Sequence, residues 1–479
     1  MSKKDSHNFV LTLRLLTQIY QENILDKRFE IARLIYNDCL REFYKMYKLM
    51  RESKRYQAII KMEKSKERTK ELYKISNDFG FTKYLTYDFC KPFYKHFKNN
   101  IDSKTAESIV KRCYSSFKKK LYKPSTNAKF KKYGSYNSIQ GLNNASGIKY
   151  RNQKLKWNGL NIPIIIKKKD EYAIEALKNK IKYCQIIRKT IRGKKKYYIQ
   201  LNLEGTPPSK GRENVNNKVG LDIGMSTIAI VSNEKANLLE LAPDLDDLEK
   251  EKRILKRKLD RQRRANNSDN YNEDGTVKEK IKLNWVESNN YIKTKNKLKE
   301  VIRKQKYLRK KAHEELANYI LSLGNEIYVE KMNFKGLQRK AKNTTINKKT
   351  GKYNSKKRFG KSIANKAPGL LIKIINRKLS YQDKEIKEIN TFKAKASQYN
   401  HVKDECKKKK LHERWTNIDG NKIQRDLYSA FLIMNVNDNL EKIDRNLCIK
   451  NFEKFKKNHD KEIARIKNSK IQCLSSMGI

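Results

Sequence analysis

The chain has 479 residues, enough for about three domains. It carries 112 Lys and Arg against 52 Asp and Glu, a formal net charge of +60. Such an excess excludes most ordinary metabolic enzymes and points to a polyanionic partner, most simply nucleic acid. Aromatic residues make up 10% of the chain, and disordered chains are poor in them. We therefore expect a folded protein with a strongly basic surface.

The cysteines indicate a reducing compartment. There are seven, they are dispersed, and no two form a CxxC pair. An odd, scattered set is typical of intracellular thiols rather than of a disulfide framework. No apolar run reaches the ~20 residues needed to span a membrane, and Thr12 and Arg14 interrupt any signal-peptide core. We expect a cytoplasmic protein with no membrane partner.

The first part of the chain predicts one strand followed by helices. Apolar and polar residues alternate within 1–24, which indicates a β-strand. Over 25–122, apolar residues recur three or four positions apart, first at 29–50 and again at 110–121. This spacing predicts a helical domain with basic outer faces. The apolar face of 29–50 is either intramolecular core or the seam of a dimer.

The pattern changes to short alternating runs separated by glycines over 123–204. These runs predict a small antiparallel sheet or barrel. The clearest hairpin spans 185–203 and turns at Arg192 and Gly193. The residues expected on one buried face of its second arm are Tyr197, Ile199, Leu201 and Leu203. The polar stretch 205–217 contains two prolines and predicts a linker.

From residue 218 the pattern becomes that of an α/β domain. Two apolar runs at 219–232 predict a pair of strands, and EIYVEKMNF at 326–334 predicts another. The charged stretch 244–322 between them predicts a long helical hairpin. Pro368 predicts the start of a further helix, and 438–479 has the pattern of a charged helical tail.

Three carboxylates stand out because each lies in an apolar setting. Asp222 lies within VGLDIG, Glu330 ends IYVE, and Asp426 begins a helix with an apolar face. Charged groups in such places are costly unless they are paired or bind metal. Converging at one sheet edge, they would offer the oxygen ligands that Mg²⁺ or Mn²⁺ takes. Two such ions clamp the attacking and leaving oxygens in phosphodiester hydrolysis.

Each carboxylate also has a purely structural explanation. Asp426 could cap its helix, since Asp is a favoured N-cap residue. Asp222 could be a turn residue, and Glu330 could pair with Lys331 or Lys335 at the surface. All three explanations would have to hold at once. The order strand, strand, helix therefore favours a shared metal site.

Three motifs carry a resemblance to a known family. GLDIG at 220–224, VEKMNFKGL at 329–337 and RDLYSAFLIMN at 425–435 resemble the RuvC-type motifs of TnpB nucleases of insertion sequences. They equally resemble those of the miniature type V-F CRISPR effectors. The resemblance is specific across about 218–436. Upstream it consists only of the order strand, helical insert, small barrel.

The resemblance implies an RNase H-like (RuvC) nuclease domain of α/β fold, preceded by a β-barrel wedge domain that a helical recognition domain interrupts. Asp222, Glu330 and Asp426 would form the catalytic, metal-binding triad. The partners implied are a guide RNA, a double-stranded DNA target and its displaced single strand, in the nucleoid of a prokaryotic cytoplasm. The implied segments are 1–24 for the first wedge strand, 25–122 for the recognition domain, 123–204 for the wedge barrel, 205–217 for the linker, 218–396 for the nuclease with its hairpin at 244–322, 397–424 for a target-loading insert, and 425–479 for the end of the nuclease and the tail.

The insert departs from the family's pattern. Most members hold a zinc ribbon with two CxxC pairs there, whereas this chain has only Cys406, with His401 and His412 nearby. Structural zinc takes four nitrogen or sulfur ligands. We therefore expect no zinc and surface positions for both histidines. The insert would fold on Trp415 and Leu411, or become ordered on nucleic acid.

These observations favour an RNA-guided DNA endonuclease that cuts beside a short adjacent motif through one two-metal site. A transposon-encoded TnpB-type nuclease is the nearest alternative, and the sequence does not separate the two. An RNA-guided repressor is disfavoured because all three carboxylates are present. A cut-and-paste transposase is disfavoured by their spacing of 108 and 96 residues. An unguided nuclease and a homodimer on one guide both stay open.

Overall fold

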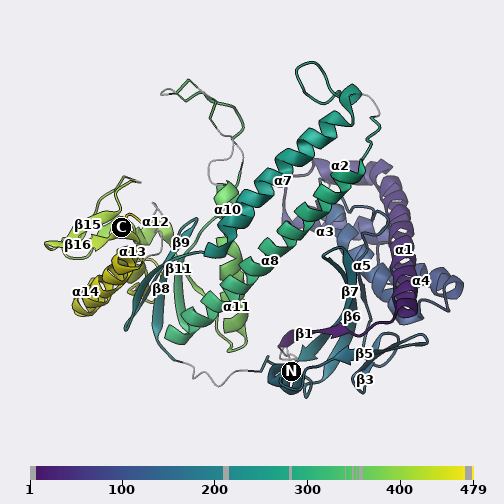
Figure 1. The fold of residues 1–479 in the computed structure, drawn as a ribbon, viewed down its shortest axis with the longest axis horizontal. Coiled ribbons are helices and arrows are strands. Elements are labelled where there is room, and N and C mark those ends of the chain that lie inside the picture. Colours follow the sequence, from purple (N-terminus) through teal and green to yellow (C-terminus); the bar gives the residue numbers. More distant parts are fainter. Residues whose placement is uncertain are drawn as a thin grey trace. The chain divides into compact units, whose positions relative to one another are not determined.

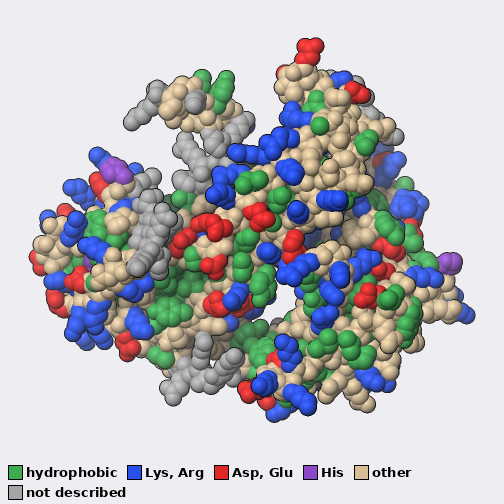
Figure 2. Space-filling view, in the orientation of Figure 1, with side chains coloured by type: hydrophobic (Ala, Val, Ile, Leu, Met, Phe, Trp, Pro, Cys, Tyr) green, Lys and Arg blue, Asp and Glu red, His purple; other side chains and the backbone are tan. Residues whose placement is uncertain are grey.

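The computed structural model describes the chain except residues 1–6, 83, 124, 209–214, 280–282, 340, 348–349, 352, 355–359, 411 and 470–476. The chain forms two compact units, Met1–Pro208 and Ser209–Ile479 (Figure 1). Their division falls inside the stretch that the sequence predicts as a linker. Lys and Arg side chains are spread over the face shown in Figure 2. Among the described helices, none combines the length and apolar character needed to cross a membrane.

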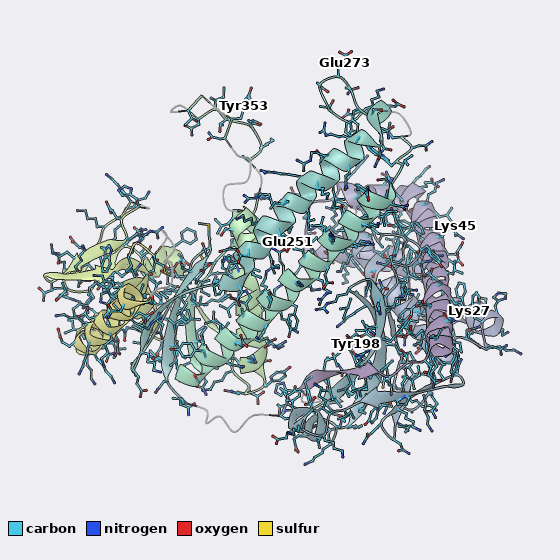
Figure 3. The ribbon with its side chains drawn as sticks, viewed as in Figure 1. Lys27, Lys45, Tyr198, Glu251, Glu273 and Tyr353 are labelled. Atoms are coloured by element: carbon cyan, nitrogen blue, oxygen red, sulfur yellow. The ribbon has the colours of Figure 1, made fainter. Side chains whose placement is uncertain are left out.

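The first unit contains a helical layer with its own core. Its helices are α1 (Ile19–Glu52), α2 (Lys54–Lys61), α3 (Lys66–Asp78), α4 (Leu85–His96) and α5 (Ser103–Tyr122). Phe29, Phe43 and Met50 of α1 are fully buried within the single chain, and the Phe43 ring lies 5.6 Å from that of Phe117 on α5. The apolar face of α1 is therefore intramolecular core, and the dimer-seam alternative for it is wrong. Lys27 and Lys45 lie on the exposed side of α1 (Figure 3).

Helix α1 begins at Ile19, inside the segment expected to hold only the first strand. The reason is local, because Gln18 and Gln21 form a capping box at this end. Glutamine is not among the residues favoured at an N-cap, so the sequence gives little warning of the start.

The strands of the first unit form one antiparallel sheet in the order β2-β6-β7-β1-β5-β4-β3. Their bounds are β1 (Asn8–Leu15), β2 (Ser138–Gln140), β3 (Lys149–Arg151), β4 (Lys154–Trp157), β5 (Leu160–Ile165), β6 (Ile181–Ile191) and β7 (Lys194–Glu204). A short helix, α6 (Glu171–Ala176), connects β5 to β6. Strand β1 thus pairs with strands that follow the helical insert in sequence. Among the described strands, the end strands β2 and β3 do not pair with each other, so the sheet is open.

The hairpin predicted over 185–203 is confirmed by β6 and β7. Arg192 and Gly193 turn it with φ values of 49° and 76°, the left-handed geometry of a two-residue hairpin turn. Tyr197, Ile199 and Leu201 are buried, as the alternation predicts.

The second unit is built on a mixed five-stranded sheet in the order β10-β9-β8-β11-β12. The strands are β8 (Lys218–Ile223), β9 (Thr227–Ser232), β10 (Ala236–Glu240), β11 (Glu326–Glu330) and β12 (Lys387–Ile389). Strand β9 is antiparallel to both of its neighbours, whereas β8, β11 and β12 run parallel. The carboxyl ends of β8 and β11 therefore meet at one edge of the sheet.

Helices cover both faces of this sheet (Figure 1). Leu371 and Ile375 of α11 (Pro368–Ser380) and Ile320 of α8 (Asn289–Leu323) pack on one face. Residues of α13 (Arg425–Met434) and α14 (Arg445–Asn468) pack on the other. The second unit is thus a three-layer α/β/α arrangement, as the α/β pattern predicts.

The remaining elements of this unit are short, except for one helix. Helix α7 (Asp246–Ala265) packs on α8, and together they form the hairpin expected at 244–322. The others are η1 (Pro243–Leu245), η2 (Ser268–Asn270), α9 (Phe334–Leu337), α10 (Gly360–Lys366), α12 (Thr391–Ala394), β13 (Tyr399–Asn400), β14 (Glu405–Cys406), β15 (Trp415–Ile418) and β16 (Asn421–Gln424).

Candidate active site

Asp222 and Glu330 lie next to each other at the carboxyl edge of the sheet. In the parallel pair β8 and β11, Tyr328 lies opposite Gly220 and Val329 opposite Leu221, a constant offset of 108 residues. One step further, the same offset places Glu330 beside Asp222. Adjacent strands are about 4.8 Å apart, and residues at one register position face the same side of the sheet. The strand pairing therefore brings the two carboxylates together.

Helix α13 brings the third carboxylate to the same place. Its backbone crosses β8 at Gly220, where an added Cβ would come within 2.1 Å of the Ala430 carbonyl oxygen. Glycine is thus required for this close approach. Asp426 lies in the first turn of α13, and its charge acts on Asp222. The structure therefore brings all three predicted residues together.

The electrostatics of the cluster are those of carboxylates forced together. Burial, then the charges of Asp426 and Glu330, raise the pKa of Asp222 to about 8, although Ser429 and Arg425 act in the opposite sense. Burial also raises the pKa of Glu330. The Glu330 Oε1 atom is buried and has no hydrogen-bond partner among the described residues. A cation at this place would relieve both the repulsion and the unpartnered oxygen.

This arrangement predicts a pH dependence of folding in the absence of divalent cations. The folded state holds a proton on Asp222 that the unfolded state releases, so stability falls as the pH rises from 3.8, the ordinary aspartate pKa, through about 8. Urea midpoints in EDTA at several pH values measure this slope. The Asp222→Asn variant serves as control, because it lacks the titrating group. Equal slopes in both proteins would contradict the raised pKa of Asp222.

The structural explanations for the three residues fail. The N-cap of α13 is Gln424, whose side chain accepts from the Leu427 backbone N–H, and not Asp426. Asp222 lies within β8 opposite Ala229 and is not a turn residue. In the described part of the chain, Glu330 forms no ion pair with either neighbouring lysine.

Gln424 is a site residue that sequence reasoning missed. It is fully buried, and its Nε2 lies 3.1 Å from the Met477 carbonyl oxygen and 3.4 Å from Asp426 Oδ2. Its backbone N–H donates to His459 Nε2 at 3.0 Å. Gln424 therefore joins the start of α13, α14 and the segment at 477–479. A Gln before an Asp carries no sequence signal for this role.

We expect Gln424→Ala to lower the free energy of unfolding by about 1 kcal/mol, because the helix cap is removed. Urea denaturation followed by circular dichroism measures it. Gln424→Asn is the matched variant, because Asn is a good N-cap residue but is too short to keep the Met477 hydrogen bond. If Ala and Asn destabilise equally, the hydrogen bond to Met477 matters and the cap does not.

The residue types at this edge fit divalent cations, since carboxylate oxygens are the ligands of Mg²⁺ and Mn²⁺. The charge repulsion at Asp222 and the buried, unpartnered Glu330 oxygen also fit a bound divalent cation. The side chains as placed do not form a coordination shell. Among the described residues, no group of three or more His, Cys, Asp or Glu side chains is arranged to hold an ion.

The insert before α13 folds on an aromatic cluster that includes a buried histidine. His401 is 1% exposed, so its expected surface position is wrong. Its Nδ1 lies 2.7 Å from Tyr428 Oη, its ring lies 4.8 Å from that of Phe452, and burial lowers its pKa to about 4. His412 is exposed, as expected. Their different environments explain why spacing alone could not place both.

Trp415 anchors the second half of the insert. Its ring packs against the α13–α14 core, and its Nε1 donates to the Gly478 carbonyl oxygen at 2.7 Å. The expected role of Trp415 in folding the insert is thus confirmed. Leu411, the other residue expected there, lies outside the described residues. Cys406 is exposed.

The fold and the carboxylates together define a mixed α/β protein with an acidic site at the carboxyl edge of a central sheet. No family model matches the chain, and no curated protein matches it. Two similar solved structures are cryo-EM complexes. One is a Cas12f1–sgRNA–target DNA complex, with a TM-score of 0.44 and 13% identity, covering 91% of this chain and 100% of that one. The other is a CRISPR–Cas12f ternary complex, with a TM-score of 0.28 and 15% identity, covering 88% and 82%.

Proposed function

We propose that this protein is an RNA-guided DNA endonuclease that hydrolyses phosphodiester bonds with Asp222, Glu330 and Asp426. The observation that carries the proposal is the convergence of these three carboxylates on the sheet edge, where burial and the two neighbouring charges raise the pKa of Asp222. In the five-stranded sheet, β9 alone runs antiparallel to the other strands. This strand order supports an RNase H-like nuclease domain. The guide RNA and DNA target rest on the motif resemblance and the net charge of +60.

The three carboxylates would hold two divalent cations, which when bound polarise the scissile phosphate and activate a water molecule. The fold of the protein holds the three carboxylates in position. Strand pairing fixes Asp222 beside Glu330, and the contact of α13 with Gly220 fixes the helix that carries Asp426. Arg414, whose Nη1 lies 3.8 Å from Asp426 Oδ2, adds a positive charge that favours a phosphate at the same place.

Helix α7 supplies a candidate surface for the nucleic-acid backbone. It has no buried residue, and Arg253, Lys256 and Arg257 are exposed on it. In the described part of the chain none of these three forms an ion pair, so their charges are available to phosphates. Figure 2 shows Lys and Arg side chains along the α7–α8 hairpin.

Replacing these three α7 residues by Gln is expected to weaken nucleic-acid binding and to flatten its salt dependence. The slope of log K against log salt should fall by about one for each phosphate that the variant no longer binds. Filter binding at several salt concentrations measures it. The matched control changes Lys450, Lys454 and Lys457, which are exposed on α14. Equal effects of the two triple variants would mean diffuse attraction rather than a surface on α7.

The function is tested by purifying the full chain from cells that carry its native locus and sequencing any RNA bound to it. A DNA duplex that matches this RNA is then added with Mg²⁺. Cutting that requires the match supports the proposal. Bound RNA and tight duplex binding without a cut would favour an RNA-guided repressor. Cutting without bound RNA would favour an unguided nuclease.

The genetic context separates the two guided nucleases, because they share these motifs. A repeat array beside the gene would indicate a CRISPR effector, and transposon ends would indicate a TnpB-type nuclease. The mass of the purified complex decides whether one or two protein copies bind each guide.

A further inference from the structure

A cavity of about 490 Å³ opens beside Glu330, at the carboxyl end of β11. Its walls come from the ends of β8 and β11, from α9, from the first turns of α11 and from β12. The volume is within the range of about 300–1,000 Å³ typical of small-ligand sites. The proposed catalytic carboxylates do not account for it, because Glu330 alone among them lines it.

The floor of the cavity is apolar and includes one aromatic ring. Ile223 and Val329 belong to the buried core beneath it, and Phe334, Leu370 and Ile372 are partly buried around it. An aromatic ring in such a position can stack on a nucleobase, and a base presents a flat apolar face of the matching kind. The floor therefore suits a base better than a phosphate.

The positive charges around the cavity lie at its opening and not on its apolar floor. Lys335 and Lys373 line it and are exposed, so they lie at its mouth. Neither forms an ion pair with a carboxylate in the described part of the chain. They therefore suit a phosphate at the mouth. Glu388 also lines the cavity, and its negative charge disfavours a phosphate there.

We propose that this cavity receives the unstacked base of the nucleotide next to the scissile phosphate, with Phe334 against the base and Lys335 and Lys373 on the adjoining backbone. The inference rests on the proposed nuclease function, because Glu330 places the cavity next to the bond to be cut. It adds a subsite that holds the strand in position. Such a subsite makes the cleavage rate depend on the presence of a base at one position.

Gly369 offers a way to fill the cavity. It lines the wall in the first turn of α11, and an added Cβ would meet only the Phe334 ring, at 3.4 Å. Gly369→Leu should therefore fill the cavity, whereas Gly369→Ala adds a single methyl group and serves as the matched control. Equal melting temperatures of the two variants would show that Leu is accommodated.

The test is single-turnover cleavage by the full chain with its guide RNA and Mg²⁺, on duplexes that carry one abasic residue at each position near the cut in turn. We expect one position at which removal of the base slows the wild type roughly 10- to 100-fold, the size of one base–aromatic stack. Gly369→Leu should slow cleavage of the intact duplex by a similar factor, and should not slow the abasic duplex further. Gly369→Ala adds one methyl group 3.4 Å from the Phe334 ring and should slow cleavage far less than Gly369→Leu does.

The outcomes separate this inference from the function on which it rests. If the wild type cuts no matched duplex, the nuclease proposal fails. If the wild type cuts and no abasic position slows it, the subsite is wrong, whether or not Gly369→Leu folds. Additive effects of Gly369→Leu and the abasic residue would also overturn it, because independent sites add and a shared contact does not.

Discussion

Asp222→Asn should abolish Mg²⁺-dependent cleavage, with a loss of at least about 1,000-fold in the single-turnover rate. The substitution keeps the size of the side chain and removes the negative charge that would bind the cations. Binding of guide RNA and target DNA should be unchanged, because the Lys and Arg residues that supply it are untouched. Rates on a matched duplex, with filter binding beside them, measure both.

The same variant should be more stable than the wild type in EDTA. Burial, together with the charges of Asp426 and Glu330, raises the pKa of Asp222 to about 8, so a neutral Asn removes an unfavourable buried charge. Added Mg²⁺ should raise the melting temperature of the wild type but not that of the variant, because ligand binding to the folded state stabilises it.

A loss of activity with a gain in stability is what a binding site predicts and what a structural residue does not. Asp244→Asn is the matched control, since Asp244 is an exposed aspartate of the same unit and should change neither quantity. If Asp222→Asn keeps its cleavage activity, the proposed triad is wrong, however well the duplex is bound.

The three carboxylates could be predicted from sequence because each carries a local signal. A charge at the end of an apolar strand or at the start of an apolar helix is visible in a short window. The convergence of Asp222 and Glu330 follows from strand pairing, since the spacing of 108 residues between them is also the register offset of β8 and β11. This spacing can be counted in the sequence, but the sequence does not show that β8 and β11 are neighbouring strands.

The residues that sequence reasoning missed act through distant partners. Gln424 contacts Met477, which is 53 positions away, and His401 is buried against Tyr428 and Phe452. No short window contains both members of such a pair. The cavity beside Glu330 is a stronger case, because its walls come from five elements between Ile223 and Glu388. Local sequence patterns predict helices and strands, whereas a cavity between them depends on how these elements pack together.

Gly220 tests whether the packing of α13 positions the site. A Cβ there would lie 2.1 Å from the Ala430 carbonyl oxygen and 2.6 Å from the Met434 backbone nitrogen. Both are backbone atoms, so the clash cannot be relieved by a side-chain rotation, and the helix must move away from β8. We expect Gly220→Ala to lower the free energy of unfolding by about 3 kcal/mol.

The movement of α13 should also lower the cleavage rate, because α13 carries Asp426. A displacement of about 1 Å can cost about 100-fold in rate when catalytic groups are misplaced, and we expect a loss of that size in Gly220→Ala at temperatures where it is folded. Gly369→Ala adds the same methyl group in the same unit with no contact closer than 3.4 Å, and should lose much less stability and rate than Gly220→Ala. Gly220→Ala that is destabilised but cleaves at the wild-type rate would show that Asp426 does not need its present position. Wild-type stability in Gly220→Ala would instead show that α13 does not lie as close to β8 as the structure places it.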